Sequence, residues 1–331
     1  MVSVKNTPNW KLVTECEKLA SSNFLEAPPA GVTIQVLVGD ASTRCYYRIN
    51  SPFGPVVLMH MPEPFEENNF PYLDNYELFR TAGLSLAEIY FMKPERGWVF
   101  LQDLGDHTYY ELNSTWNNQA RAHFFLESVN QARQIATIQP RSTLTFDTEK
   151  LLWELEYFKR NFLERFRRIE LSENEAQSLA TFSHRLASEL ASEPRFFCHR
   201  DYHSRNLMVH EDQIYIVDFQ DARLGPVTYD LASLCYDSYI QHSPGLIAQL
   251  EGIFFTYHPS ARVQRYEYPR MCLQRNLKAL GTFGYQASQM GREFYVQFVD
   301  RTLGYIRHHF DKLPEYAEMR QILSNHLPEL R

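Results

Sequence analysis

The chain has 331 residues, 44% of them hydrophobic and 14% aromatic, which is enough for two lobes with packed interiors. Lys and Arg number 33 against 40 Asp and Glu, and this net charge of −7 argues against a nucleic-acid partner. Five scattered cysteines without a Cys-x-x-Cys pair argue against a disulfide framework or a zinc site. No stretch reaches the roughly 18 apolar residues of a membrane helix, and residues 1–10 lack an apolar signal core, so we expect a cytoplasmic protein without membrane contact.

The first hundred residues predict a small lobe of antiparallel strands. Amphipathic spacing predicts a helix over 10–22 and another over 72–80. Short β-rich runs bounded by turns predict strands over 33–38, 45–49, 56–61, 86–90 and from 98 onward. The chain then changes from apolar to acidic over 102–106. We therefore place a lobe boundary near residue 103, which separates residues 1–103 from residues 104–331.

The second lobe is predicted to be mainly helical. Apolar residues recur at helical spacing over 109–112, 117–139, 150–170, 172–191, 229–235, 244–258, 261–289, 291–309 and 314–326. Two strand-like runs, 207–209 and 214–217, flank a polar turn and predict a hairpin, and 221–228 is predicted to be a loop. The predicted fold class is α+β, with a small antiparallel β lobe and a larger helical lobe.

The predicted hairpin brings together side chains that suit a metal ion. Folding the chain about Asp212 places Asn206 beside Asp218, and one carboxylate with one amide oxygen suits Mg²⁺. Asp201 lies five residues before Asn206, within reach of a substrate hydroxyl. A hairpin whose carboxylates only cap turns explains Asp212 but not this cluster.

The order of these residues is that of a kinase catalytic loop followed by a metal loop. His199-x-Asp201, four residues, Asn206, a strand and then Asp218-Phe219 match that spacing. We therefore predict a two-lobed, protein-kinase-like fold that uses ATP and Mg²⁺. Asp201 is predicted to be the catalytic base, and Asn206 and Asp218 are predicted to hold the metal.

The first turn of the small lobe is predicted to lie over the ATP phosphates. It has one glycine, so backbone N–H groups and the hydroxyls of Ser42 and Thr43 would bind phosphate. An ordinary hairpin turn is the alternative. The third strand has Met59 and lacks the usual phosphate-binding lysine. Arg44 or Arg48 would supply the missing charge, unless both are simply solvated.

Other positions are predicted to support the nucleotide or the catalytic loop. The link between lobes offers backbone groups of Gln102 and Leu104 to the adenine edge. His199 is expected to orient the catalytic loop, and Asp230 to brace it by accepting hydrogen bonds. Glu77 would occupy the place of the helix carboxylate that pairs with a kinase lysine, but without that lysine we interpret it as an exposed charge.

Substrate binding is predicted just beyond these loops. Asp221 and Arg223 offer one acceptor and one cation to a sugar, with an ion pair within the loop as the alternative. His203 either lies near the substrate or packs structurally. Arg275 and Lys278 share a helical segment, where a solvated face is favoured over binding of a sugar carboxylate.

The motifs over residues 196–235 resemble the aminoglycoside phosphotransferase and choline kinase superfamily. A histidine two residues after Asp201 is more typical of these small-molecule kinases than of protein kinases. Finer features resemble one bacterial branch, and they are Gly39-Asp40-Ala41-Ser42-x-Arg44-x-Tyr46-Tyr47-Arg48, the lysine-free third strand, Leu101-x-Asp103-Leu104-Gly105, Asp218-Phe219-Gln220-Asp221-Ala222 and Gln274-Arg275-Asn276-Leu277-Lys278-x-Leu280-Gly281-x-Phe283.

That resemblance implies a kinase of the anomeric hydroxyl of N-acetylmuramate and N-acetylglucosamine in peptidoglycan recycling. Its partner would be a small-molecule sugar. A kinase of an aminoglycoside or of an amino alcohol such as choline is one alternative, and those cationic substrates would need a strongly acidic pocket. A non-catalytic nucleotide-binding scaffold is the other alternative, suggested only by Met59. The sequence does not indicate an oligomeric state.

Overall fold

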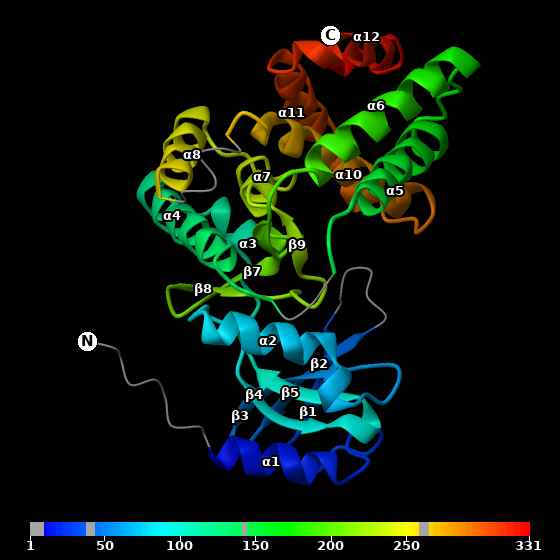
Figure 1. Ribbon diagram of the computed structural model, residues 1–331. Coiled ribbons are helices and arrows are strands. Elements are labelled where there is room, and N and C mark those ends of the chain that lie inside the picture. Colours follow the sequence, from blue (N-terminus) through cyan, green and yellow to red (C-terminus); the bar gives the residue numbers. More distant parts are fainter. Residues whose placement is uncertain (1–9, 38–43, 141–143, 258–264) are drawn as a thin grey trace.

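The computed structural model describes residues 10–37, 44–140, 144–257 and 265–331. Figure 1 shows a sheet with two flanking helices at one end of the molecule and a helical assembly at the other. The sheet has five antiparallel strands in the order β1-β2-β3-β5-β4. Their bounds are β1 Thr33–Leu37, β2 Cys45–Ser51, β3 Gly54–His60, β4 Ile89–Lys93 and β5 Trp98–Gln102.

Both faces of this sheet are covered, because successive side chains of a strand point to opposite faces. Helix α1 (Trp10–Ala20) packs on one face in a core that includes Leu58 of β3. Helix α2 (Pro71–Thr81) lies on the other side, and Met59 of β3 belongs to the core that α2 shares with the helical end. The sheet therefore connects to the rest of the molecule through α2 and the segment that follows β5.

The chain from Tyr109 onward forms the helical end. Its helices are α3 Tyr109–Asn113, α4 Asn118–Ile135, α5 Thr148–Phe158, α6 Glu173–Ala191, α7 Tyr229–Cys235, α8 Pro244–Tyr257, α10 Tyr268–Ser288, α11 Val299–Asp311 and α12 Ala317–His326. Helix α5 continues directly into π-helical turns over Lys159–Phe166. Within the described residues, no helix is long and apolar enough to cross a membrane. The division at residue 103 stays a proposal.

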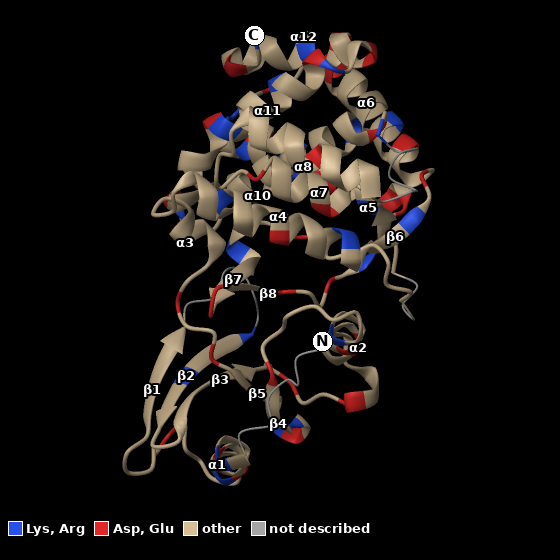
Figure 2. Ribbon diagram, turned by 90° about the vertical axis from the view of Figure 1, so that its left-hand side faces the viewer, with Lys and Arg blue, Asp and Glu red and all other residues tan. Residues whose placement is uncertain are grey.

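The predicted hairpin forms at the end of the helical part that faces the sheet (Figures 1 and 2). Strands β7 (Leu207–His210) and β8 (Gln213–Ile216) pair with Leu207 opposite Ile216. Glu211 and Asp212 form the turn with φ of 49° and 58°, the left-handed pair that a two-residue hairpin turn requires. This tight turn fixes the register and brings residues 206 and 217 side by side.

The predicted loop over 221–228 is wrong in part. Arg223–Pro226 forms strand β9, which pairs antiparallel with β6 (Arg195–Cys198). The segment Arg-Leu-Gly-Pro has little strand propensity of its own, because Gly and Pro weaken strands. Its partner β6 precedes the whole catalytic loop, so the pairing encloses that loop between two fixed strands.

Helix α10 passes unusually close to α5 and the π-helical turns that follow. A Cβ atom on Gly281 would lie 2.9 Å from the backbone of Phe158, and one on Gly284 would meet the carbonyl oxygen of Asn161. Only glycine permits this approach. The close contact fixes where the middle of α10 lies, and that middle carries Arg275 and Lys278.

Candidate functional site

A buried carboxylate, that of Asp230, binds the backbone of the predicted catalytic loop. Asp230 of α7 accepts hydrogen bonds from the backbone N–H groups of His199 at 2.7 Å and Arg200 at 3.0 Å. Burial raises the pKa of Asp230, although these bonds and the nearby His199 oppose the shift. The Nε2 atom of His199 lies 2.9 Å from the carbonyl oxygen of Val217. These contacts tie the loop both to α7 and to the end of the hairpin.

The hairpin brings the three predicted chemical residues into one cleft. Asn206 Nδ2 donates to the carbonyl oxygen of Asp201 at 2.9 Å, and the N–H of Val217 donates to the carbonyl oxygen of Asn206 at 3.1 Å. Asp218 follows with a φ of 64°, a left-handed conformation that turns the chain out of β8. Asp201, Asn206 and Asp218 all line the same cleft.

Two clefts meet at this point. The first, the α10 cleft, has a volume of about 700 Å³ and is lined by residues that include Tyr157, Arg200, Asp201, His203, Lys278 and Thr282. The second, the hinge cleft, has a volume of about 570 Å³ and is lined by residues that include Val57, Leu101, Gln102, Leu104, Met208 and Val217. Three residues line both clefts, and they are Arg205, Asn206 and Asp218.

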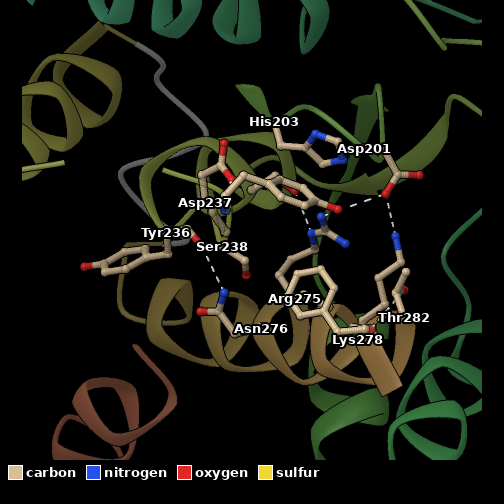
Figure 3. Close-up of a pocket in the computed structure, with 14 residues that line it drawn as sticks. Asp201, His203, Tyr236, Asp237, Ser238, Arg275, Asn276, Lys278 and Thr282 are labelled. Atoms are coloured by element: carbon tan, nitrogen blue, oxygen red, sulfur yellow. Dashed lines mark hydrogen bonds and ion pairs between the residues drawn. The ribbon is translucent and has the colours of Figure 1, made fainter. Parts of the chain in front are cut away.

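Cations surround the carboxylate of Asp201 (Figure 3). Lys278 Nζ lies 2.5 Å from Asp201 Oδ1, Arg275 Nη2 lies 3.9 Å from the same atom, and Arg200 Nε lies 3.8 Å from Oδ2. Burial raises the pKa of Asp201, but the charges of Lys278, Arg200 and Arg275 outweigh it and hold the pKa well below its usual value. The carboxylate is therefore ionised at neutral pH.

The predicted solvated face of α10 is wrong. Arg275 is only 6% exposed, and the Lys278 side chain is 13% exposed. Burial, together with Arg275 and Arg200, lowers the pKa of Lys278 to about 8 although Asp201 opposes the shift. The sequence pattern could not reveal this, because a cation pair at helical spacing looks the same on a buried and on an exposed face.

The three residues predicted for substrate binding lie in different surroundings. His203 lines the α10 cleft, and burial lowers its pKa to about 3 despite the nearby Asp201, so its ring is neutral. Asp221 also lines the cleft and accepts from Arg200 Nη1 at 3.0 Å. Arg223 lines neither cleft and lies 3.8 Å from Asp221, so the alternative of an ion pair within the loop is present.

The two arginines considered for the missing lysine have different partners. Arg44 donates to Asp218 at 3.2 Å and to Gln220 at 2.8 Å, beside the junction of the clefts. Arg48 contacts both carboxylate oxygens of Asp103, at 2.6 and 3.0 Å, and one oxygen of Asp106 at 2.6 Å. Its charge is therefore offset within the protein, although Arg48 also lines the hinge cleft.

The remaining predicted nucleotide residues lie at the hinge cleft or outside the described chain. Gln102 and Leu104 both line the hinge cleft. The N–H of Gln102 donates to Glu88 at 2.8 Å, and the carbonyl oxygen of Leu104 lies 3.2 Å from His210 Nδ1. Ser42 and Thr43 lie outside the described residues.

Sequence reasoning missed the arginine at the junction. The guanidinium of Arg205 lies 5.1 Å from the ring centre of Tyr239 and 5.3 Å from that of Phe294. Arg205 lines both clefts and immediately precedes Asn206 in the chain. That adjacency was the available signal, because residues next to each other on a turn lie close together.

Sequence reasoning also missed the contact between α2 and the metal loop. Glu77 is 58% exposed and pairs with Arg80, as the exposed-charge interpretation expects. Asn75 instead donates from Nδ2 to the carbonyl oxygens of Phe219 and Gln220, both at 3.0 Å. Its place on the apolar face of α2, one residue before Tyr76, was the only indication that it is buried.

The donor atoms at the junction fit a divalent cation shared with phosphate. Asn206 and Asp218 offer an amide oxygen and a carboxylate, which are ligands for Mg²⁺ or Ca²⁺. The described residues contain no cluster of three or more His, Cys, Asp or Glu side chains that could hold a metal.

A catalytic loop, a metal loop and two joined clefts between a sheet and a helical assembly define a kinase-like phosphotransferase. The chain belongs to the phosphotransferase enzyme family (APH), whose model matches residues 33–268. It is 29% identical to the N-acetylmuramate/N-acetylglucosamine kinase of Pseudomonas aeruginosa over 95% of this chain and 93% of that protein. It is 27% identical to the protein of the same name from Pseudomonas putida, over 89% and 88%.

Solved structures confirm the predicted fold. A choline/ethanolamine kinase family protein from Mesorhizobium loti matches with a TM-score of 0.60 and 17% identity, over 96% of this chain and 99% of that one. An amicoumacin kinase in complex with AMP-PNP and Ca²⁺ matches with a TM-score of 0.53 and 16% identity, over 83% and 88%. The chain therefore has the two-lobed, kinase-like fold expected from its sequence.

Proposed function

We propose that this protein transfers the γ-phosphoryl group of ATP to the anomeric hydroxyl of N-acetylmuramate or N-acetylglucosamine. The observation that carries the proposal is the meeting of two clefts at Asn206 and Asp218, with Asp201 on the acceptor side. The names of the curated relatives supply the sugars. The reaction would serve the recycling of cell-wall sugars in the cytoplasm, where ATP is available.

ATP would occupy the hinge cleft. Val57, Leu101 and Met208 offer apolar walls for the adenine ring, and the backbone of Gln102 and Leu104 lies at its edge. The phosphates would then extend toward Asn206 and Asp218. The turn that carries Ser42 and Thr43 would cover them, as the sequence predicts.

Asn206 and Asp218 would hold Mg²⁺. When bound, the cation supplies neutralising charge to the β- and γ-phosphates. Arg44 contacts Asp218, which lines both clefts, and its charge is therefore close to the junction. We assign Arg44, rather than Arg48, as the replacement for the third-strand lysine. Arg205 lines both clefts, and the phosphoryl group must pass between them. We therefore propose that Arg205 offsets the negative charge on the phosphoryl group while it is transferred.

Asp201 would orient the acceptor and receive its proton. The sugar oxygen forms a bond to the γ-phosphorus, its proton passes to Asp201, and the bond between that phosphorus and the bridging oxygen breaks to release ADP. An ionised carboxylate is required for this step, and Lys278, Arg275 and Arg200 keep Asp201 in that form. His203 and Asp221 would contact the sugar, and Arg223 would hold Asp221 in place.

The charge of the α10 cleft distinguishes this proposal from a kinase of cationic acceptors. The charged residues that line the cleft are Arg44, Arg200, Arg205 and Lys278 against Asp201, Asp218 and Asp221. An aminoglycoside or choline carries positive charge and would gain little from such a lining. A neutral or acidic sugar fits it better.

A coupled assay tests the proposal directly. ADP release is measured with N-acetylmuramate, N-acetylglucosamine, an aminoglycoside and choline as acceptors, and the products are identified by phosphorus NMR. We expect turnover with the amino sugars and a 1-phosphate as the product. Turnover only with an aminoglycoside or choline, or a phosphate on another hydroxyl, would contradict the proposed acceptor. Nucleotide binding without turnover on any acceptor would favour the scaffold alternative.

A further inference from the structure

A small pocket is lined in part by Asp201 and shares no lining residue with the hinge cleft. Its volume is about 70 Å³, several times the roughly 10–15 Å³ that one water needs on the same measure. Residues that line it include Asp201, His203, Ala232, Arg275, Ala279 and Phe283, and we name it the side pocket. It shares Asp201, His203, Tyr239, Lys278 and Thr282 with the α10 cleft, so it continues that cleft at its reactive end.

One residue that lines the side pocket, Arg275, has a buried donor atom without a partner among the described residues. Arg275 is 6% exposed, its Nε donates to Ser233 Oγ at 2.6 Å, and its Nη2 faces Asp201 at 3.9 Å. Its Nη1 atom is buried and has no hydrogen-bond partner among the described residues. The same holds for Nδ1 of His203, which also lines the pocket. Buried polar groups are normally satisfied, so an acceptor atom from a ligand is expected here.

The charges that line the side pocket offset each other. Two basic side chains, Arg275 and Lys278, and two carboxyl side chains, Asp201 and Asp237, line the pocket. Figure 3 shows Arg275 and Lys278 extending from α10 toward Asp201, so the Asp201 carboxylate already offsets part of their charge. A ligand carboxylate would find little net attraction and would lie close to Asp201. The unpartnered donor therefore calls for a neutral acceptor such as an amide carbonyl.

The rest of the lining is small or apolar. Ala232, Ala279 and Phe283 leave room for a methyl group beside the polar atoms. A substituent that enters this pocket while the reacting hydroxyl meets Asp201 must be attached to a carbon near the reacting one. We propose that the side pocket is the subsite for the acetamido group of the sugar, with its carbonyl oxygen bound by Arg275 Nη1 and its methyl group against Ala279. This inference rests on the proposed function.

Filling the pocket tests this assignment. We expect Ala279→Val to lower kcat/KM for N-acetylglucosamine by about 10–100-fold, because extra methyl groups exclude a substituent of that size. The kcat/KM for glucose, which lacks the acetamido group, should change by less than about threefold. Ala279→Ser, a smaller change that the helix tolerates, should act in the same direction with a smaller loss. The matched control is Ala287→Val, on the same helix but outside both the pocket and the clefts.

The wild-type protein provides the second readout. Its kcat/KM for N-acetylglucosamine should exceed that for glucose by at least about tenfold, and Arg275→Gln should reduce this ratio. The KM for ATP and the unfolding temperature of each variant show whether the fold is intact. Equal losses for both sugars in Ala279→Val, or no preference in the wild type, would overturn the subsite alone. A wild type that phosphorylates no sugar would overturn the subsite together with the proposed function.

Discussion

In the hinge cleft a cation is surrounded by carboxylates, whereas in the α10 cleft a carboxylate is surrounded by cations. Arg48 contacts both oxygens of Asp103, so its charge is offset before any ligand arrives. Asp201 faces Lys278 and Arg275, which keep it ionised in a partly buried position. The two clefts therefore suit different tasks: the hinge cleft suits binding, and the α10 cleft suits the reaction. In the proposed binding mode, the hinge cleft offers a nearly neutral surface to adenine, and the α10 cleft stabilises an anion where phosphate would bring further negative charge.

Removing the anion should produce the largest effect. Asp201→Asn keeps the shape of the side chain but cannot accept the proton, so kcat should fall by about 10²–10⁴-fold while the KM for ATP stays close to that of the wild type. Steady-state kinetics with N-acetylglucosamine measure both parameters. Asp212→Asn, at the distant hairpin turn, is the matched control. A kcat near that of the wild type would show that Asp201 is not the base.

Removing the cation at the junction should produce the next largest effect. Arg205→Met keeps an apolar side chain among the aromatic rings but removes the charge, and kcat should fall by about a hundredfold, somewhat less than an arginine finger contributes. Added guanidinium should partly restore turnover, which a purely structural role would not allow. The control is Arg133→Gln, because Arg133 also lies over an aromatic ring, that of Tyr257, but lines neither cleft. A loss that guanidinium does not restore would contradict the assignment.

Removing one of the cations around Asp201 should shift the pH profile. Lys278 helps to hold the pKa of Asp201 below its usual value, so Lys278→Met should raise that pKa and move the acidic limb of the kcat profile to higher pH. The direction follows because protonated Asp201 is inactive, and a higher pKa means that protonation begins at a higher pH. Lys278→Arg retains the charge and should leave the limb nearly in place. An unchanged limb in Lys278→Met would refute the coupling.

Replacing the two arginines of the small lobe should produce the smallest effects, and the effects of the two replacements should differ. Arg44→Ala should raise the KM for ATP by about tenfold, since about 1.4 kcal/mol is typical of one charge-assisted hydrogen bond. Arg48→Ala should raise it by less than about threefold, because the carboxylates of Asp103 and Asp106 already offset that charge. Titrating ATP at saturating sugar measures both values. The reverse order would mean that Arg48 is the phosphate-binding cation.

The catalytic loop and hairpin could be predicted from the sequence because their pattern is local. Asp201, Asn206 and Asp218 lie within eighteen positions of one another, and a tight turn alone brings the ends of β7 and β8 together. Four of the five strands of the small lobe followed from the same short-range signals, whereas β4 (Ile89–Lys93) overlaps its predicted range, 86–90, only at its first two residues. The order of the strands and the place of α2 depend on packing, which no single segment specifies.

The surroundings of Asp201 could not be predicted, because they come from a distant helix. Lys278 lies 77 positions from Asp201 in the chain, and only the packing of α10 brings the two together. Strand β9 was missed for a similar reason, since its partner β6 precedes the catalytic loop. Arg205 was missed although it is local, because cation–aromatic contacts to Tyr239 and Phe294 leave no spacing pattern in the sequence.

The glycine pair of α10 has a consequence for how this scaffold accommodates new acceptors. At Gly281 and Gly284 the backbone of α10 packs directly against that of Phe158 and Asn161, so a larger side chain at either position would displace the helix. Exchanging side chains that α10 presents to the side pocket, at positions such as Ala279, would change the acceptor site without moving the helix. To redirect the enzyme toward sugars with larger or smaller substituents, the side chains of α10 that line the pocket, such as Ala279, should be varied, and Gly281 and Gly284 should be kept.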